Sequence, residues 1–400
     1  MADRITRTTH TSWFSRMRSA TGGIITGFVL IVVAIGLLFW NEGHAVNTAR
    51  ALSEGAGQVI TIDPSAPPPG AEGKLVHFSG DLVVDGKPAD DLFTAISVPG
   101  NANRLVRTVE MYQWREEKRT ETRKKLGGGE EKITTFTYKR DWSSQPIDSS
   151  RFEDPSGHTN PPMPVKSASF SASQGHVGAI ALPGARIAGL GERQQIPLGE
   201  SGRKAVLGAL GISGPATATT GEVYIGANPA SPMTGDLRIS FSANTASQIS
   251  AVGKLSGNAL EPFKASNGVN ISMTRAGNIT AAEMFEAAQS TNATIKWALR
   301  AAGLLAMYIG FRMVFAIIGV VGDVVPAVGN LLRYATGLVA LALTAILGGL
   351  VIGVAWLWFR PLLALTIIAA GAVLAVVLLG VGKRRAASRA KPNFGIERPA

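Results

Sequence analysis

The chain has 400 residues, a net charge of +11, a mean hydropathy of +0.19 and 46% hydrophobic residues. Such a length would suit two or three soluble domains, but the hydropathy favours a membrane protein. The sequence contains no cysteine, which excludes disulfides and thiolate metal sites.

The charge is unevenly distributed along the chain. Residues 41–297 contain 25 Lys and Arg residues and 25 Asp and Glu residues, so this long segment is neutral. The basic excess therefore lies in the apolar parts and their flanks. A neutral central segment argues against nucleic acid as the reason for the high isoelectric point.

The first apolar run covers residues 22–40 and follows a basic tail, residues 1–21. About 20 apolar residues cross a bilayer core of roughly 30 Å as a helix. We interpret this run as an uncleaved signal anchor, because it is long and ends in Trp40 without a small-residue cleavage site. Asn41-Glu42-Gly43 predicts the end of the helix, since glycine suits a left-handed cap. A short stalk helix at 45–59 and a proline-rich linker at 63–70 should follow.

A β-rich segment begins at residue 74. The pattern predicts a strand at 74–84 and a long hairpin, with strands at 104–119 and 130–142 around Gly127-Gly128-Gly129. The hairpin tip, residues 115–132, carries dense charge of both signs, which is typical of a solvated ribbon with cross-strand ion pairs.

The rest of the central segment is less regular. Residues 165–221 are rich in Gly, Ala and Ser and support no assignment, whereas strands are predicted at 221–226, 235–242, 248–256 and 269–274. Thr280 and Glu283 form a capping box that should start a helix leading to the second crossing. Residues 41–297 thus form an α+β domain that is mostly strand.

Three further apolar runs give transmembrane helices at 298–322, 335–359 and 361–382, before a basic tail at 383–400. Arg360-Pro361 leaves only a short turn between the last two. Positive flanks stay in the cytoplasm, so both termini should be cytoplasmic and the inserted domain extracytoplasmic. The predicted fold is four transmembrane α-helices, one N-terminal and three C-terminal, with a large β-rich α+β domain between the first and second.

Six short motifs occur in order along the chain: NEG at 41–43, GKLVH at 73–77, VEMYQW at 109–114, GDLRISFS at 235–242, WALRAAGLLAM at 297–307 and FRPLLAL at 359–365. With these motifs the chain resembles the TMEM43 (LUMA) family of four-pass membrane proteins. The motif residues that we single out are Asn41, Glu42, Gly43, Glu110, Tyr112, Trp114, Trp297 and Arg300.

The resemblance implies an organiser of membrane protein complexes, which in eukaryotes lies in the endoplasmic reticulum and inner nuclear membrane with its large domain in the lumen. The segment from about residue 167 to residue 221 shows no correspondence to the family. Short tails and Ala/Gly-rich helices suggest a bacterial member, whose domain would face the periplasm from the inner membrane.

Arg312 lies about ten residues inside the second crossing, where a charge is costly and a functional role is the default hypothesis. No Asp or Glu lies within any of the four runs. Snorkelling to the headgroups or bonding to helix carbonyls are the structural alternatives, and lipid binding or partner binding is the functional one. Transport is less favoured, because an ion pathway needs several polar groups.

Two pairs of small residues at four-residue spacing are candidates for close helix packing. They are Gly23 with Gly27 and Gly349 with Gly353. Packing within the chain and self-association both remain open. Trp297, Tyr334, Trp356 and Trp358 lie near helix ends, where aromatic rings anchor at the interface.

Catalytic signals are absent. The five histidines are scattered without metal-ligand spacing, and the glycine cluster of the hairpin lacks the GK[ST] that a phosphate loop needs. We expect no enzyme activity, no cofactor and no metal. The leading hypothesis is a membrane scaffold that assembles with itself or with other membrane proteins. A lipid-binding or lipid-transfer module is the alternative, and a transporter or channel is third. Anionic lipid headgroups could bind the basic tails.

Overall fold

A computed structural model of the chain describes residues 4–371, 373 and 376–377. The chain divides into two compact units. The β-rich unit consists of Met1–Arg16, Thr48–Asn292 and Asp323–Pro326, and the helical unit consists of Met17–Asn47, Ala293–Gly322 and Ala327–Ala400.

Among the described residues, three helices are long and apolar enough to cross a membrane. They are α1 (Trp13–Gln58), α4 (Ala281–Gly322) and α5 (Pro326–Phe359). The predicted crossings at 22–40, 298–322 and 335–359 all fall inside these helices. Of the fourth predicted crossing, Pro361–Gly371 is a shorter apolar helix. Most of the remainder of that crossing, and the tail at 383–400, lie outside the described residues.

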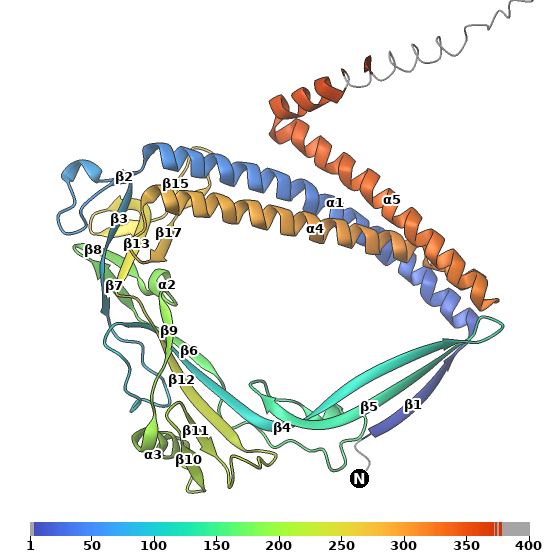
Figure 1. Ribbon diagram of the computed structural model, residues 1–400, viewed down its shortest axis with the longest axis horizontal. Helices are drawn as coiled ribbons and strands as arrows, with labels where there is room; N and C mark the ends of the chain where they lie inside the picture. The colour runs from blue at the N-terminus through green and yellow to red at the C-terminus, as the bar shows by residue number, and fades with distance from the viewer. Residues whose placement is uncertain (1–3, 372, 374–375, 378–400) are drawn as a thin grey trace, which may run out of the picture. The chain divides into compact units, whose positions relative to one another are not determined.

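The N-terminal segment differs from the prediction. Residues 4–11 are strand β1 (Arg4–Thr11), which pairs antiparallel with β5 (Glu130–Ser143) from Arg4 opposite Thr137 to Thr11 opposite Glu130. In Figure 1, β1 lies along the arm formed by β4 (Ala102–Lys124) and β5. The segment predicted as a basic tail at 1–21 therefore contains a strand and the start of α1, and its side of the membrane stays a prediction.

The first sheet of the β-rich unit carries the predicted hairpin, β4 and β5. Its strand order is β1-β5-β4-β12-β11-β10, with β6 paired to β4 and β9 paired to β12. The strands not yet given are β6 (Ala168–Ser171), β9 (Glu192–Gln195), β10 (Ala216–Ala218), β11 (Glu222–Ile225) and β12 (Leu237–Thr245). Cross-strand ion pairs such as Lys139 with Glu117, at 2.8 Å, confirm the charged ribbon.

The second sheet follows the order β17-β13-β14-β8-β7-β3-β2, and β13 also pairs with β3. Its strands are β2 (Ile60–Thr61), β3 (Leu75–Asp85), β7 (Gln174–Val177), β8 (Ile180–Pro183), β13 (Gln248–Ser256), β14 (Ala259–Glu261) and β17 (Met273–Ala276). A separate two-stranded sheet joins β15 (Phe263–Lys264) to β16 (Asn270–Ile271). The predicted strands at 74–84, 221–226, 235–242 and 248–256 are confirmed, and the one at 269–274 is divided between β16 and β17.

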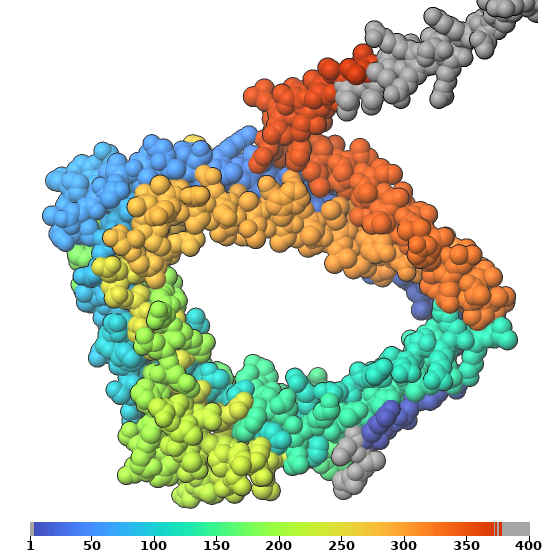
Figure 2. Space-filling view, viewed as in Figure 1, coloured from blue at the N-terminus to red at the C-terminus, as the bar shows by residue number. Residues whose placement is uncertain are grey.

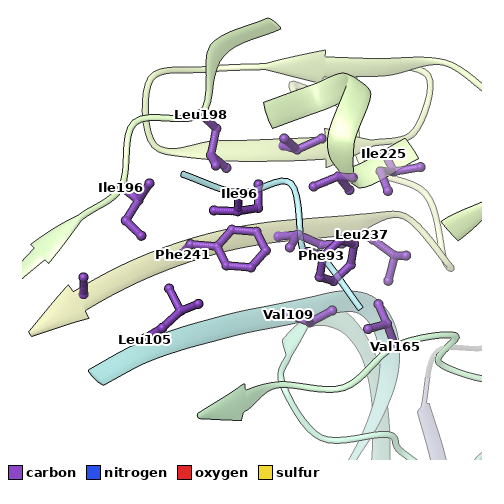
Figure 3. Close-up of a cluster of buried hydrophobic side chains, with 14 of the residues drawn as sticks. Phe93, Ile96, Leu105, Val109, Val165, Ile196, Leu198, Ile225, Leu237 and Phe241 are labelled. Atoms are coloured by element: carbon purple, nitrogen blue, oxygen red, sulfur yellow. The ribbon is translucent and has the colours of Figure 1, made fainter. Parts of the chain in front are cut away.

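The core of the β-rich unit packs alternate strand residues against loops and short helices. Figure 3 shows Phe241 of β12 and Leu105 and Val109 of β4 beside Phe93 of the preceding loop. The rings of Phe93 and Phe241 meet edge to face at 5.5 Å. The remaining elements, α2 (Gly184–Ile187) and α3 (Gly199–Leu210) and the short 3-10 turns η1 (Pro69–Ala71) and η2 (Ser149–Arg151), complete the unit. The segment that the sequence left unassigned thus holds α2, α3 and five short strands.

A second packed cluster in this unit explains why α1 and α4 are longer than their apolar runs. Ala51 and Leu52 of α1 pack with Met284 and Phe285 of α4 and with Leu75 of β3. At the start of α4, Glu283 Oε2 accepts the Thr280 N–H at 2.9 Å and Thr280 Oγ1 accepts the Glu283 N–H at 3.3 Å. The predicted capping box is therefore confirmed.

Candidate functional site

In the helical unit, α1 and α4 pack side by side, as the blue and light-orange surfaces of Figure 2 show. Ala34, Leu38 and Met307 form their buried centre. A Cβ placed on Gly303 would lie 2.7 Å from Leu38, so the glycine allows the two helices to approach closely. This packing aligns the polar residues at the ends of the apolar stretches.

A buried carboxylate joins the three long helices. Glu42 of α1 is 2% exposed. Its Oε1 accepts a hydrogen bond from Arg300 Nε of α4 at 2.5 Å, and its Oε2 accepts one from Arg300 Nη2 at 2.8 Å. Oε2 also accepts the indole N–H of Trp356 on α5 at 2.9 Å. One carboxylate thus receives three hydrogen bonds from two other helices.

Aromatic faces surround the guanidinium of this pair. The Arg300 guanidinium carbon lies 4.6 Å from the ring centre of Trp297 and 5.7 Å from that of Trp356. Burying two charges has a large desolvation cost, which is offset only by good geometry and additional hydrogen bonds. The bidentate contact and the cation–π contacts provide both.

The neighbours of Glu42 complete the junction. Asn41 Nδ2 donates to the Lys296 carbonyl at 3.1 Å. A Cβ on Gly43 would lie 2.5 Å from Phe359 Cζ, so only glycine fits against this ring. The prediction that Asn41-Glu42-Gly43 ends the first helix is therefore wrong. These residues continue α1 because each satisfies a contact with α4 or α5.

The structure brings together only some of the motif residues. Asn41, Glu42, Gly43, Trp297 and Arg300 form the junction, although the two halves of the ion pair are 258 positions apart. Trp356 was missed, because it was interpreted only as an interface anchor. The available signal was its indole N–H, which needs an acceptor when it lies at the edge of an apolar helix.

The remaining motif residues, Glu110, Tyr112 and Trp114, lie on β4 in the β-rich unit. Glu110 Oε2 accepts a hydrogen bond from Arg238 Nε at 2.7 Å. The ring centres of Tyr112 and Trp142 are 5.3 Å apart. The backbone N–H of Trp114 donates to Asn160 Oδ1 at 2.7 Å. Asn160 Nδ2 returns a bond to the Trp114 carbonyl at 2.9 Å. These contacts stabilise the strand and its flanking loop.

Arg312 lies on α4, twelve residues beyond Arg300, and is half-buried. Its Nη1 donates to the main-chain carbonyl of Arg333 on α5 at 2.6 Å. A Cβ on Gly337 would lie 2.8 Å from that nitrogen. The guanidinium is thus held by a helix carbonyl, one of the alternatives open from the sequence.

The two glycine pairs have different surroundings. A Cβ on Gly27 would lie 2.6 Å from the Gly310 carbonyl oxygen, and one on Gly23 would lie 4.0 Å from that of Met313. Gly27 therefore allows α1 and α4 to cross closely. Additions at Gly349 and Gly353 meet nothing within 4 Å among the described residues.

The β-rich unit contains a second buried charge cluster. Asp323 of the α4–α5 turn is 0% exposed and binds Arg16 Nη2 at 2.5 Å and Lys124 Nζ at 3.3 Å. Arg16 also contacts Glu130 at 2.8 Å and donates to the Gly128 carbonyl at 2.6 Å. This cluster joins the N-terminal segment, the hairpin tip and the turn.

In the described part of the chain, no group of three or more His, Cys, Asp or Glu side chains is arranged to hold a metal ion. The polar side chains of the helical junction are used in contacts among the helices. The geometry of this site is that of a joint between membrane helices.

Comparisons with known proteins agree with the motifs. The sequence model of a family described as transmembrane protein 43 matches residues 111–361. Human transmembrane protein 43 is 29% identical over 383 residues, which cover 92% of this chain and 91% of the human protein. The Drosophila melanogaster homologue is 30% identical over 370 residues, covering 86% of this chain and 91% of that protein. No solved structure matches the chain. The chain is an integral membrane protein and belongs to the transmembrane protein 43 family.

Proposed function

We propose that the protein is a non-enzymatic membrane scaffold that organises or stabilises complexes of other membrane proteins. The observation that carries this proposal is the junction at Glu42, where three hydrogen bonds hold three helices at one buried carboxylate. A scaffold needs membrane helices in a fixed arrangement, and a neutralised, enclosed charge pair supplies one. A catalytic carboxylate would instead need access to a substrate.

The test is cross-linking and affinity purification of the full chain from native membranes. We expect the wild-type chain to capture itself or other integral membrane proteins. Glu42→Gln should lower that capture at equal expression, because it loosens the helical junction. Glu117→Gln is the matched control, since Glu117 is half exposed on the hairpin and pairs only at the surface with Lys139.

A chain that stays monomeric in detergent at all concentrations and captures no membrane protein would contradict the scaffold. Equal capture by wild type and Glu42→Gln would show that the helical junction is not involved. Transport of a solute by the purified chain in vesicles would favour the transporter class instead.

A further inference from the structure

An apolar groove of about 530 Å³ lies on the helical unit, between α5 and the short helix Pro361–Gly371. Its wall includes Ile346, Leu350, Val354, Leu357 and Ile367. Gly349 and Gly353 also line it, and because neither has a side chain the groove is open there. From Ile346 to Leu357 it extends about 16 Å along α5 at 1.5 Å per residue.

One residue connects this groove with the buried ion pair. Trp356 lines the groove and its indole N–H donates to Glu42. Next to that pair, Lys296 lies within electrostatic range of Arg300, Arg360 and Glu42. Three cationic side chains and one carboxylate therefore leave a net charge of about +2 at this end of the groove.

These charges lie at the ends of the apolar runs, where helices that cross a membrane meet the headgroup region. Glu42 follows the apolar run of α1, Lys296 precedes the crossing predicted at 298–322, Arg300 lies in its first turn, and Arg360 follows the apolar run of α5. Trp297, Trp356 and Trp358 lie at the same helix ends, where indole rings favour the headgroup region. A ligand here would have its polar group among cations and its apolar part against α5.

We propose that this groove binds an anionic phospholipid, with one acyl chain along Gly349 and Gly353 and the phosphate beside Lys296 and Arg360. Basic side chains near a membrane surface attract anionic lipids, and the apolar lining fits a hydrocarbon chain. The glycines keep the groove open, since a large side chain such as leucine at either position would occupy part of it. The site is independent of the scaffold proposal, and Arg312 is not part of its lining.

The test is native mass spectrometry of the full-length protein, released from micelles containing either phosphatidylglycerol or phosphatidylcholine. We expect one phosphatidylglycerol to be retained preferentially. The double variant Lys296→Gln with Arg360→Gln should weaken that binding roughly thirtyfold. Each basic side chain near a membrane surface strengthens the binding of anionic lipid by about fivefold to sixfold, and the two factors multiply. Gly353→Leu should reduce retention of both lipids by filling the groove.

Two matched controls accompany these variants. Lys139→Gln removes an exposed cation from the hairpin, and Gly22→Leu adds the same side chain to an open position of α1. Both should retain phosphatidylglycerol as the wild type does. Circular dichroism checks that every variant is folded. Equal retention of the two lipids by the wild type, or retention unchanged in both the double variant and Gly353→Leu, would overturn the proposal.

Discussion

The buried charge clusters at Glu42 and at Asp323 differ in what they connect. The junction at Glu42 joins three helices within the helical unit. The cluster at Asp323 joins a turn, a hairpin tip and the N-terminal segment within the β-rich unit. Glu42 has one cationic partner shown in contact with it, whereas Asp323 has two and Arg16 has a second carboxylate, Glu130. Loss of one partner should therefore have a larger effect at Glu42.

The largest effect is expected for Glu42→Gln. It leaves the Arg300 guanidinium buried without a counter-charge, which costs about 3–5 kcal/mol in comparable pairs. Thermal unfolding in detergent, followed by helical circular dichroism, measures the loss. Glu42→Gln combined with Arg300→Met should recover much of it, because the unpaired charge is then gone. If Glu42→Gln alone had the same melting temperature as the wild type, the Glu42–Arg300 pair would not be a major source of stability.

The next effect concerns the Asp323 cluster. Asp323→Asn should release the hairpin tip, at a cost of about 3 kcal/mol or less because Arg16 keeps Glu130. The readout is a disulfide between Arg7→Cys and Thr134→Cys, which are direct partners in the β1–β5 register. The chain has no native cysteine to interfere. We expect this bond in the purified protein and less of it with Asp323→Asn.

The matched control for that disulfide is Arg7→Cys with Thr120→Cys. Thr120 pairs with Thr134 on the far side of β5, so it is two strands away from Arg7 and out of disulfide reach. If neither pair forms a bond, the β1–β5 register is wrong and the N-terminal segment is free of the hairpin.

A smaller effect tests how the helices that carry Glu42 and Arg300 approach each other. Gly27→Ala places a Cβ 2.6 Å from a carbonyl oxygen, so α1 and α4 must separate. Overpacking of this kind costs about 1–3 kcal/mol. Gly353→Ala, which meets nothing within 4 Å, should leave the melting temperature unchanged. Equal melting of both variants would show that α1 and α4 do not cross at Gly27.

Arg312→Met should have a net effect of about 1 kcal/mol or less. It removes a hydrogen bond from a charged donor, worth about 1.5–3 kcal/mol, but also a charge that costs about 2.5–3.5 kcal/mol within a membrane. The two terms nearly cancel, in contrast to Glu42→Gln. A loss of stability as large as that of Glu42→Gln would mean that Arg312 has a carboxylate or lipid phosphate as partner in the membrane.

The smallest expected effect is a pH dependence of the folding stability, which comes from the buried, neutral imidazole of His77. His77 is 4% exposed, with Nε2 2.9 Å from the Ile279 carbonyl, and burial lowers the pKa of its imidazole below the ordinary 6.5. The unfolded chain then takes up the proton first, so stability is complete above pH 6.5 and falls as the pH drops below it. His77→Gln should flatten this slope in urea unfolding, and the exposed His10→Gln should not.

The sequence predicted those parts of the fold whose signals are local. The hairpin has β-branched runs on both sides of a glycine cluster, and the helix at Thr280 has a capping box within four residues. Residues 165–221 gave no pattern because their strands are only three or four residues long, and some of them, such as β6 and β9, pair with strands far away in the sequence. The register of β1 also depends on a partner more than a hundred positions away, although its four threonines, which favour a strand, were a signal.

The candidate site was only half predictable for the same reason. The motif residues at 41–43 and at 297–300 were singled out, but nothing local showed that Glu42 would meet Arg300. Without that partner, a glutamate and a glycine after an apolar run indicate a helix end. The contact reverses this interpretation, because a neutralised carboxylate can stay in a helix that continues.

The helices of the helical unit also differ in hydrophobic length. At 1.5 Å per residue, the apolar run of α1 at 22–40 spans about 28 Å and that of α5 at 335–359 about 37 Å. In a bilayer core near 30 Å, α1 matches the thickness while α5 must tilt to bury its excess. The protein should therefore respond to lipid chain length through α5, and membranes of greater thickness should bring α5 closer to upright.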